Sequence, residues 1–169
     1  IGRVPVLYVP WVMFPTDDRR RTGLLYPAVS LSGRNGFDYR QPVYLNLAPN
    51  YDATLTPRLM SKRGALLGGE FRWLYSQGRG EVAGTWMPDD RLPEDDPGRY
   101  RDPDGNLLPP PSGSNRAQFA ANALHDFNRT WSAKANLAWV SDRYYLQDFS
   151  NSLFGQSAFY IGSNVGLYG

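Results

Sequence analysis

The stretch QPVYLNLAPNYDATLTPRLM, residues 41–60, alternates apolar and polar side chains on both sides of a short turn. Such alternation predicts two antiparallel β-strands. Each strand nevertheless contains a proline, Pro42 or Pro57, and proline has no N–H to donate to a neighbouring strand. With a three-residue turn at 48–50, Pro57 lies opposite Gln41 and beside Pro42. We therefore expect both interruptions at nearly one height of the sheet.

The same alternation recurs along most of the chain, with an apolar and a charged face in each predicted strand. Strands of about nine to eleven residues with this pattern are typical of a membrane β-barrel, although the strands of a soluble antiparallel sandwich also alternate. Aromatic residues near the strand ends favour the barrel, because such rings gather at membrane interfaces; they are Tyr51, Trp73, Tyr75, Trp86, Trp131 and Trp139. The predicted strands lie at about 37–47, 51–59, 67–75, 82–86 and 131–139, with weaker patterns at 117–127 and 157–168.

Composition narrows the possible functions. The chain has 169 residues, no cysteine and a formal charge of only +2, so we expect neither disulfides nor nucleic-acid binding. His125 is the single histidine, and the clustered carboxylates lie in a proline-rich segment without an apolar pocket, so no enzymatic chemistry, cofactor or metal site is predicted. No apolar run approaches the roughly 18 residues of a membrane helix, so any membrane role rests on strands. Because the chain begins at Ile1 without a signal segment, we expect it to be an excerpt of a longer, processed polypeptide.

Three segments depart from the alternating pattern. Residues 1–16 are apolar on both parities and contain three prolines, which is typical of strands packed against another sheet or lying at an edge. A charged link, DDRRRTG at 17–23, follows, and we place a domain boundary within 17–35. Residues 88–116 hold 7 of the 14 prolines and 7 acidic residues, which predicts a long solvated loop; the acidic residues lack the spacing of a calcium loop.

Four stretches carry a resemblance to a known family: PVLYVPWVMFPTDDRRRTGLLYP, QPVYLNLAPNYDATLTPRLMSKRG, GGEFRWL and VSDRYYLQDF. In this order they resemble the LPS-assembly outer-membrane protein family (LptD, also called OstA or Imp), over nearly all of the chain except the 88–116 loop. The resemblance implies an all-β protein in the outer membrane of a Gram-negative bacterium. A periplasmic β-jellyroll would be followed by the first strands of a large antiparallel transmembrane β-barrel.

The resemblance also implies a function. Lipopolysaccharide would be received from a periplasmic bridge protein, and its sugars would cross a lumen that holds a lipoprotein plug. Its acyl chains would pass into outer-membrane lipid through a seam beside the first barrel strand, so that the molecule is inserted into the outer leaflet. Two alternatives stay open, a general porin or small-solute channel and a soluble carbohydrate-binding sandwich.

The implied domains are the last jellyroll strands at 1–16, a junction at 17–35 and about seven barrel strands within 36–169. If the first strand rises outward from the periplasm, parity places the 88–116 loop on the periplasmic side. Barrels of this kind usually have short periplasmic turns. Either one strand is missing from this prediction or the loop is an exception.

The resemblance assigns a lateral gate to Pro42 and Pro57, for which plain protection of a sheet edge is the alternative. Charged and hydroxyl side chains of the even-numbered face are predicted to line the substrate path, or to form no more than a wetted wall; they are Asp38, Arg40, Tyr44, Asp52, Arg58, Glu70, Arg72 and Lys134. An acyl-chain groove, or an ordinary jellyroll core, is predicted from Val6, Tyr8, Trp11, Val12 and Phe14. Arginine–carboxylate pairs that set the angle between the domains, or a solvated linker, are predicted for Asp17, Asp18, Arg19, Arg20 and Arg21.

Overall fold

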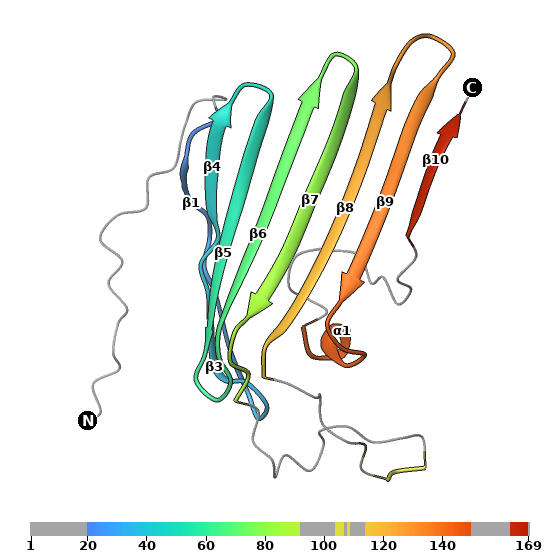
Figure 1. Cartoon of the computed structure of the whole chain (residues 1–169). Coiled ribbons are helices and arrows are strands. Elements are labelled where there is room, and N and C mark those ends of the chain that lie inside the picture. The colour runs from blue at the N-terminus through green and yellow to red at the C-terminus, as the bar shows by residue number, and fades with distance from the viewer. Residues whose placement is uncertain (1–19, 92–103, 107, 109–113, 150–162, 169) are drawn as a thin grey trace.

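The computed structural model describes residues 20–91, 104–106, 108, 114–149 and 163–168. These residues form one antiparallel sheet with a short helix packed on it (Figure 1). The strands are β1 (Gly23–Leu24), β2 (Ala28–Ser32), β3 (Gly36–Arg40), β4 (Val43–Ala48), β5 (Tyr51–Met60), β6 (Gly64–Tyr75), β7 (Gly78–Met87), β8 (Arg116–Asp126), β9 (Ser132–Val140) and β10 (Asn164–Tyr168), and the helix is α1 (Tyr145–Phe149). No helix among the described residues is long and apolar enough to cross a bilayer.

The strand order across the sheet is β1, β4, β5, β6, β7, β8, β9 and β10, so from β4 on each strand pairs with the next one in the chain. In addition, β2 pairs with β3, and β3 pairs with β5 below β4. The predicted strands at 51–59, 67–75 and 131–139 are confirmed, as is most of the weaker pattern at 117–127. The segment predicted at 157–168 lies partly outside the described residues, and only 164–168 is seen as a strand.

The edge of the sheet begins earlier in the chain than the alternation had indicated. Residues 23–24 pair with β4 and residues 28–32 pair with β3, although both segments fall within the predicted junction. Val29 and Leu31 alternate with Ser30 and Ser32, so a short strand pattern is present there. The pattern is too short, and too close to Pro27, to predict a strand of membrane length by itself.

This additional strand removes the conflict over loop lengths. Residues 49–50, 76–77 and 127–131 connect strands at one end of the sheet, which we call the short-turn end (Figure 1). β7 ends and β8 begins at the opposite end, where the 88–115 connection leaves and rejoins the sheet and where the segment that holds α1 also lies. The chain enters the sheet through β1, which runs beside β4 from the side of the short-turn end, so the long connection leaves and rejoins the sheet at the end opposite to this entry. This matches barrels with short periplasmic turns and long outer loops.

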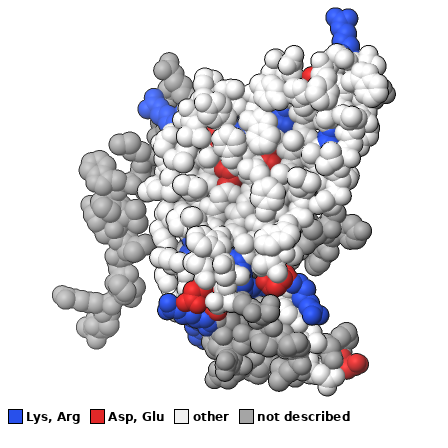
Figure 2. All heavy atoms as spheres, viewed as in Figure 1, with Lys and Arg blue, Asp and Glu red and all other residues white. Residues whose placement is uncertain are grey.

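The two faces of the sheet differ as the alternation predicts. The face that we call the apolar face carries exposed side chains that include Leu47, Tyr51, Leu55, Leu59, Leu67, Trp86, Phe119, Leu137 and Trp139. On the opposite, polar face lie the buried polar residues of the strands, Asp38, Asp52, Thr56, Arg58, Thr85 and Arg116. Figure 2 shows charged atoms gathered mainly at the end with the long connections, while the strands above are covered mainly by uncharged side chains.

Helix α1 covers part of the polar face. Tyr145 and Phe149 are four residues apart, so they share one side of the helix, and they are only 0% and 2% exposed. They pack against Met60, Leu66 and Met87 of three neighbouring strands. The helix starts where Asp142 accepts hydrogen bonds from the N–H groups of the next turn, through its carboxylate from Tyr144 and through its carbonyl from Tyr145. The small apolar core of the described chain therefore lies beneath α1.

We expect the apolar face to contact lipid, and a matched pair of substitutions tests this. Leu55 lies in the middle of β5 and is 43% exposed on the apolar face, whereas its neighbour Thr54 points to the polar face and pairs with Glu70. Arginine at a lipid-facing midplane position costs about 2–4 kcal/mol. Leu55→Arg should therefore lower the amount of heat-modifiable folded protein in outer membranes, and Thr54→Arg should not. Equal folded levels of the two variants would contradict the assignment of the faces.

Candidate functional site

The strand that follows the edge is interrupted at Pro42. Strand β3 ends at Arg40 and β4 starts at Val43, yet both pair with β5 in one continuous register, with Arg40 opposite Arg58 and Val43 opposite Leu55. Between them, the N–H of Gln41 donates to the carbonyl oxygen of Pro57 at 3.0 Å. The predicted pairing of Gln41 with Pro57 is confirmed, so the two prolines do lie at one height.

The turn above this ladder was predicted incorrectly. Instead of a three-residue turn at 48–50, Ala48 pairs with Tyr51 and the register shifts between Asn46 and Ala48. A bulge thus accommodates the extra residue inside the strand, which shortens the turn to Pro49 and Asn50. The register below the bulge is unaffected, and therefore the conclusion about the prolines stands.

A third proline lies at the same height. Pro27 directly precedes β2, whose first residue, Ala28, is opposite Arg40. Three neighbouring strand positions therefore carry Pro27, Pro42 and Pro57 at one level, which we call the proline break. The sequence interpretation missed Pro27 because it assigned residues 17–35 to the junction. The equal spacing of 15 residues between the three prolines was a visible signal.

Below the proline break, the polar face carries a buried ion pair. The guanidinium of Arg58 donates to both carboxylate oxygens of Asp38, at 2.9 and 2.6 Å. Both side chains are less than a tenth exposed. Arg40 and Arg58 also line an open cavity of about 340 Å³ between β2, β3 and α1, and Asp148 and Phe149 line it on the helix side. The predicted residues Asp38, Arg40 and Arg58 are thus brought together beside the first strands.

A second polar group lies above the break. Arg72 donates to Asp52 at 2.8 Å and lies 3.3 Å from Glu70, while the Tyr44 hydroxyl donates to Asp52 at 3.1 Å. Arg20 of the predicted junction approaches the same carboxylate at 3.5 Å. The predicted path residues therefore form two groups on one face. Lys134 is separate from both, on β9, with its Nζ atom 5.1 Å from the centre of the Tyr168 ring.

The junction is anchored by more than an ion pair. The side chain of Asn46 donates to the backbone carbonyl of Arg20, and the backbone N–H of Asn46 donates to the Thr22 hydroxyl. Arg21 is exposed. The other predicted junction residues, Asp17, Asp18 and Arg19, and the whole predicted groove, Val6, Tyr8, Trp11, Val12 and Phe14, lie outside the described residues.

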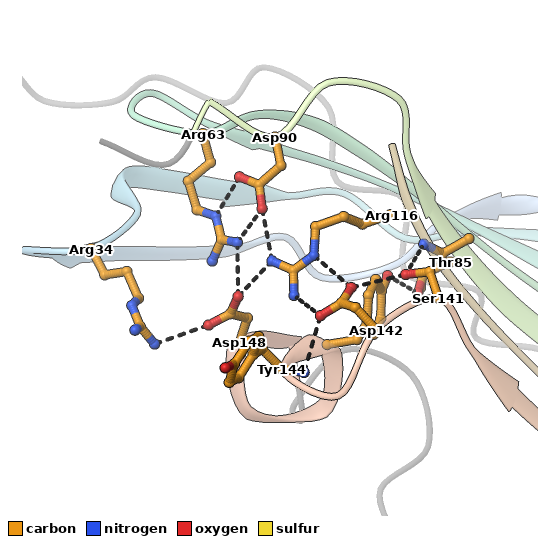
Figure 3. Close-up of polar contacts among 11 residues, drawn as sticks. Arg34, Arg63, Thr85, Asp90, Arg116, Ser141, Asp142, Tyr144 and Asp148 are labelled. Carbon is orange, nitrogen blue, oxygen red and sulfur yellow. Dashed lines mark hydrogen bonds and ion pairs between the residues drawn. The ribbon is translucent and has the colours of Figure 1, made fainter. Parts of the chain in front are cut away.

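A cluster of three arginines and three aspartates ties together the end with the long connections (Figure 3). We call Arg34, Arg63, Arg116, Asp90, Asp142 and Asp148 the rim cluster. Arg116 is central, since it donates to Asp142 with two nitrogens, at 2.9 and 2.8 Å, and to Asp90 and Asp148 with a third, at 2.8 and 2.6 Å. Arg63 bonds to Asp90 and Asp148, and Arg34 bonds to Asp148.

Burial makes the rim cluster energetically important. The side chains of Arg63, Arg116 and Asp148 are at most 1% exposed, so their charges are stabilised by one another instead of by water. Burial alone would raise the pKa of Asp90, but hydrogen bonds from Arg63 and Arg116 hold that pKa below its usual range. The same opposition, with Arg116 as donor, lowers the pKa of Asp142. Both aspartates thus stay charged at neutral pH, and the stability that these two carboxylates contribute is lost only as the pH falls through their lowered pKa values.

The sequence interpretation did not find the rim cluster or helix α1. The residues of the rim cluster lie far apart in the chain, with a separation of 114 positions between Arg34 and Asp148. The available signal was weak. Charged residues stand directly beside strand ends, as Arg63 does before β6 and Arg116 at the start of β8, but solvated turns have the same composition.

Removing the central arginine should release α1 from the sheet. Arg116→Met leaves Asp142 and the two buried aspartates, Asp90 and Asp148, without their shared partner, and breaking a buried pair of this kind costs about 3–5 kcal/mol. Hydrogen exchange of residues 141–149 in the full-length protein should rise strongly. Arg91→Met is the matched control, because the Arg91–Asp89 pair is exposed and contributes little. Equal exchange in the two variants would show that the cluster does not hold the helix.

Comparison of the sequence with known proteins shows the family of this chain. The family model LptD, LPS transport system D, matches residues 114–168. Over its full length the chain is 52% identical to the LPS-assembly protein LptD of Xanthomonas euvesicatoria pv. vesicatoria (strain 85-10) and to that of Xanthomonas axonopodis pv. citri (strain 306), and 48% identical to that of Xylella fastidiosa (strain Temecula1 / ATCC 700964). It spans 19% of the length of each of these relatives. The chain therefore belongs to the LptD family, as one segment of a longer family sequence.

Proposed function

We propose that the parent protein of this chain transports lipopolysaccharide and inserts it into the outer leaflet of the outer membrane, with release beside the first strand of the sheet. The relatives are named LPS-assembly proteins, which supports this substrate. The observation that carries the proposal is the proline break, because it interrupts the strands at one edge of the sheet. Within the described residues, that edge is formed by β1 and β2.

The proline break lowers the free energy needed to open the edge, because it allows the edge to open in steps. It divides the first strand into β1 and β2, and the second into β4 and β3, so the two halves are joined by irregular backbone. A continuous strand in lipid would have to separate from its partner along its whole ladder, because no water replaces the lost bonds. A divided strand can separate from its partner in two successive steps. Pro42 and Pro57 belong to this gate, and Pro27 lies nearest to the seam.

The polar face supplies the route for the sugar and phosphate groups. Its two groups of side chains, around Asp38 and around Asp52, offer arginines, carboxylates and a hydroxyl within the first strands. Arginine binds phosphate with two parallel hydrogen bonds, so Arg40, Arg58 and Arg72 are the proposed contacts to substrate phosphates. Lys134 extends the same face to β9.

The other elements of the proposal concern residues and partners beyond the described sheet. Residues 1–16 form the end of a periplasmic jellyroll whose groove, which includes Trp11, holds the acyl chains. The chain enters the sheet at the short-turn end, which supports a periplasmic position for this head domain. A periplasmic bridge protein delivers the substrate, and a lipoprotein plug occupies the lumen. A general porin is the alternative function.

Photocrosslinking in cells tests the substrate and its route. A light-activated residue at Trp11 or at Tyr44 of the full-length protein should form adducts that react with an antibody to lipopolysaccharide. Leu45 is the control for Tyr44, because it is the next residue of β4 and points to the other face. Adducts at Tyr44 and none at Leu45 are expected. No adduct at either Trp11 or Tyr44, together with uptake of small solutes, would favour the porin.

Substitution of the prolines tests the gate. Pro42→Ala with Pro57→Ala restores two backbone N–H groups, which face Leu25 and Gln41 of the neighbouring strands. The bonds that they can form make the divided strands stiffer by about 1–3 kcal/mol, so that the first strands move less readily when the edge opens. We expect less newly made lipopolysaccharide at the cell surface, at an unchanged level of folded protein. Pro88→Ala, in the connection after β7, is the control. Unchanged export in the double variant would leave edge protection as the role of these prolines.

A further inference from the structure

One backbone carbonyl at the proline break has lost its ordinary donor. In the pairing of β1 with β4, Gly23 is opposite Tyr44 and Leu24 is opposite Val43, which brings Leu25 opposite Pro42. The N–H of Leu25 donates to the carbonyl of Pro42 at 2.9 Å. Such a pair in an antiparallel ladder normally exchanges two bonds, but Pro42 has no N–H to return. The carbonyl oxygen of Leu25 therefore needs another donor.

The side chain of Gln41 provides that donor. Its Nε2 atom donates to the Leu25 carbonyl at 2.9 Å and to the Pro42 carbonyl at 3.1 Å. Its Oε1 atom accepts a hydrogen bond from the Tyr39 hydroxyl at 2.8 Å, which holds the amide in this orientation. The missing backbone bond is thus replaced by one from the adjacent side chain.

Gln41 lies on the apolar face of the sheet, where the presence of a polar side chain needs a reason. It has the same parity as Phe37, Val43 and Leu47, so it belongs to the apolar face, where a polar amide is otherwise out of place. In contact with lipid, an amide without partners costs several kcal/mol. Here both its nitrogen and its oxygen are engaged with the strands. A glutamine at this site is therefore explained by the bond that it makes to the first strand.

We propose that Gln41 is a positioning residue that fastens the first strand to the second at the proline break. This inference rests on the proposed lateral release. With Leu25 held by Gln41, the first strand stays attached to its own sheet, and opening is directed to its outer edge. Without that bond, the segment between β1 and β2 also separates from the second strand, and the edge that guides the substrate loses its shape.

Hydrogen exchange of the full-length protein, in outer membrane with its natural partners, tests the fastening. Gln41→Leu keeps the size of the side chain and removes its donor, so exchange of residues 22–32 should become about tenfold faster. Adding Pro42→Ala to this variant restores a backbone N–H and should return exchange close to the original rate. Gln77→Leu, in the exposed turn before β7, is the control. Unchanged exchange in Gln41→Leu, or no recovery with Pro42→Ala, would overturn the fastening.

Export is measured on the same variants. Gln41→Leu should lower the appearance of lipopolysaccharide at the surface relative to Gln77→Leu, and normal export despite faster exchange would overturn the positioning role. If Gln41→Leu does not fold, Tyr39→Phe provides the milder variant, because it removes only the hydroxyl that orients the amide; it should give a smaller change in the same direction. Failure of the proposed function is distinct, since it appears as a lack of adducts at Tyr44 in the protein with Gln41 intact.

Discussion

The missing N–H groups of three prolines are the constraint on which the first strands depend. A strand pair is held by repeated backbone hydrogen bonds, and lipid supplies no water to replace those that are lost. The structure compensates for the missing hydrogen bonds in two ways, both at the height of the proline break. The strands are divided there, so that each half pairs separately, and the Gln41 side chain donates to the carbonyl that Pro42 cannot serve. The division of the first strand allows its halves to move separately, and the bond from the Gln41 side chain limits this movement to the outer edge of that strand.

A different interaction holds the opposite end of the molecule. The rim cluster balances three arginines against three aspartates, and it brings together the connections that follow β2, β5, β7 and β9. Because Asp148 belongs to α1, the same charges dock the helix on the polar face, where Tyr145 and Phe149 complete a small apolar core. The cavity beside β2 is bounded by the helix as well as by the first strands. The rim cluster therefore shapes the polar face close to the proposed gate.

The proposed transport function combines these features. The apolar face suits lipid, and the polar face carries two groups of charged side chains next to the divided strands. An amphiphile with acyl chains and phosphorylated sugars needs both environments at one seam. Arg20 contacts Asp52 and Asn46 of the same region, so the start of the described chain is tied to the first strands.

Local sequence pattern was sufficient to predict the alternating faces, the register of the first hairpin below its bulge and the common height of Pro42 and Pro57. These follow from a period of two residues, which survives wherever one face is apolar. The three-dimensional fold was needed to see that residues 28–32 pair with β3, that α1 folds onto the sheet and that Arg116 joins three aspartates. Such contacts link positions tens of residues apart, and a short strand or a charged turn looks the same in sequence whether or not it has a partner. The bond from Gln41 to Leu25 belongs with these, because its meaning depends on the strand that lies opposite.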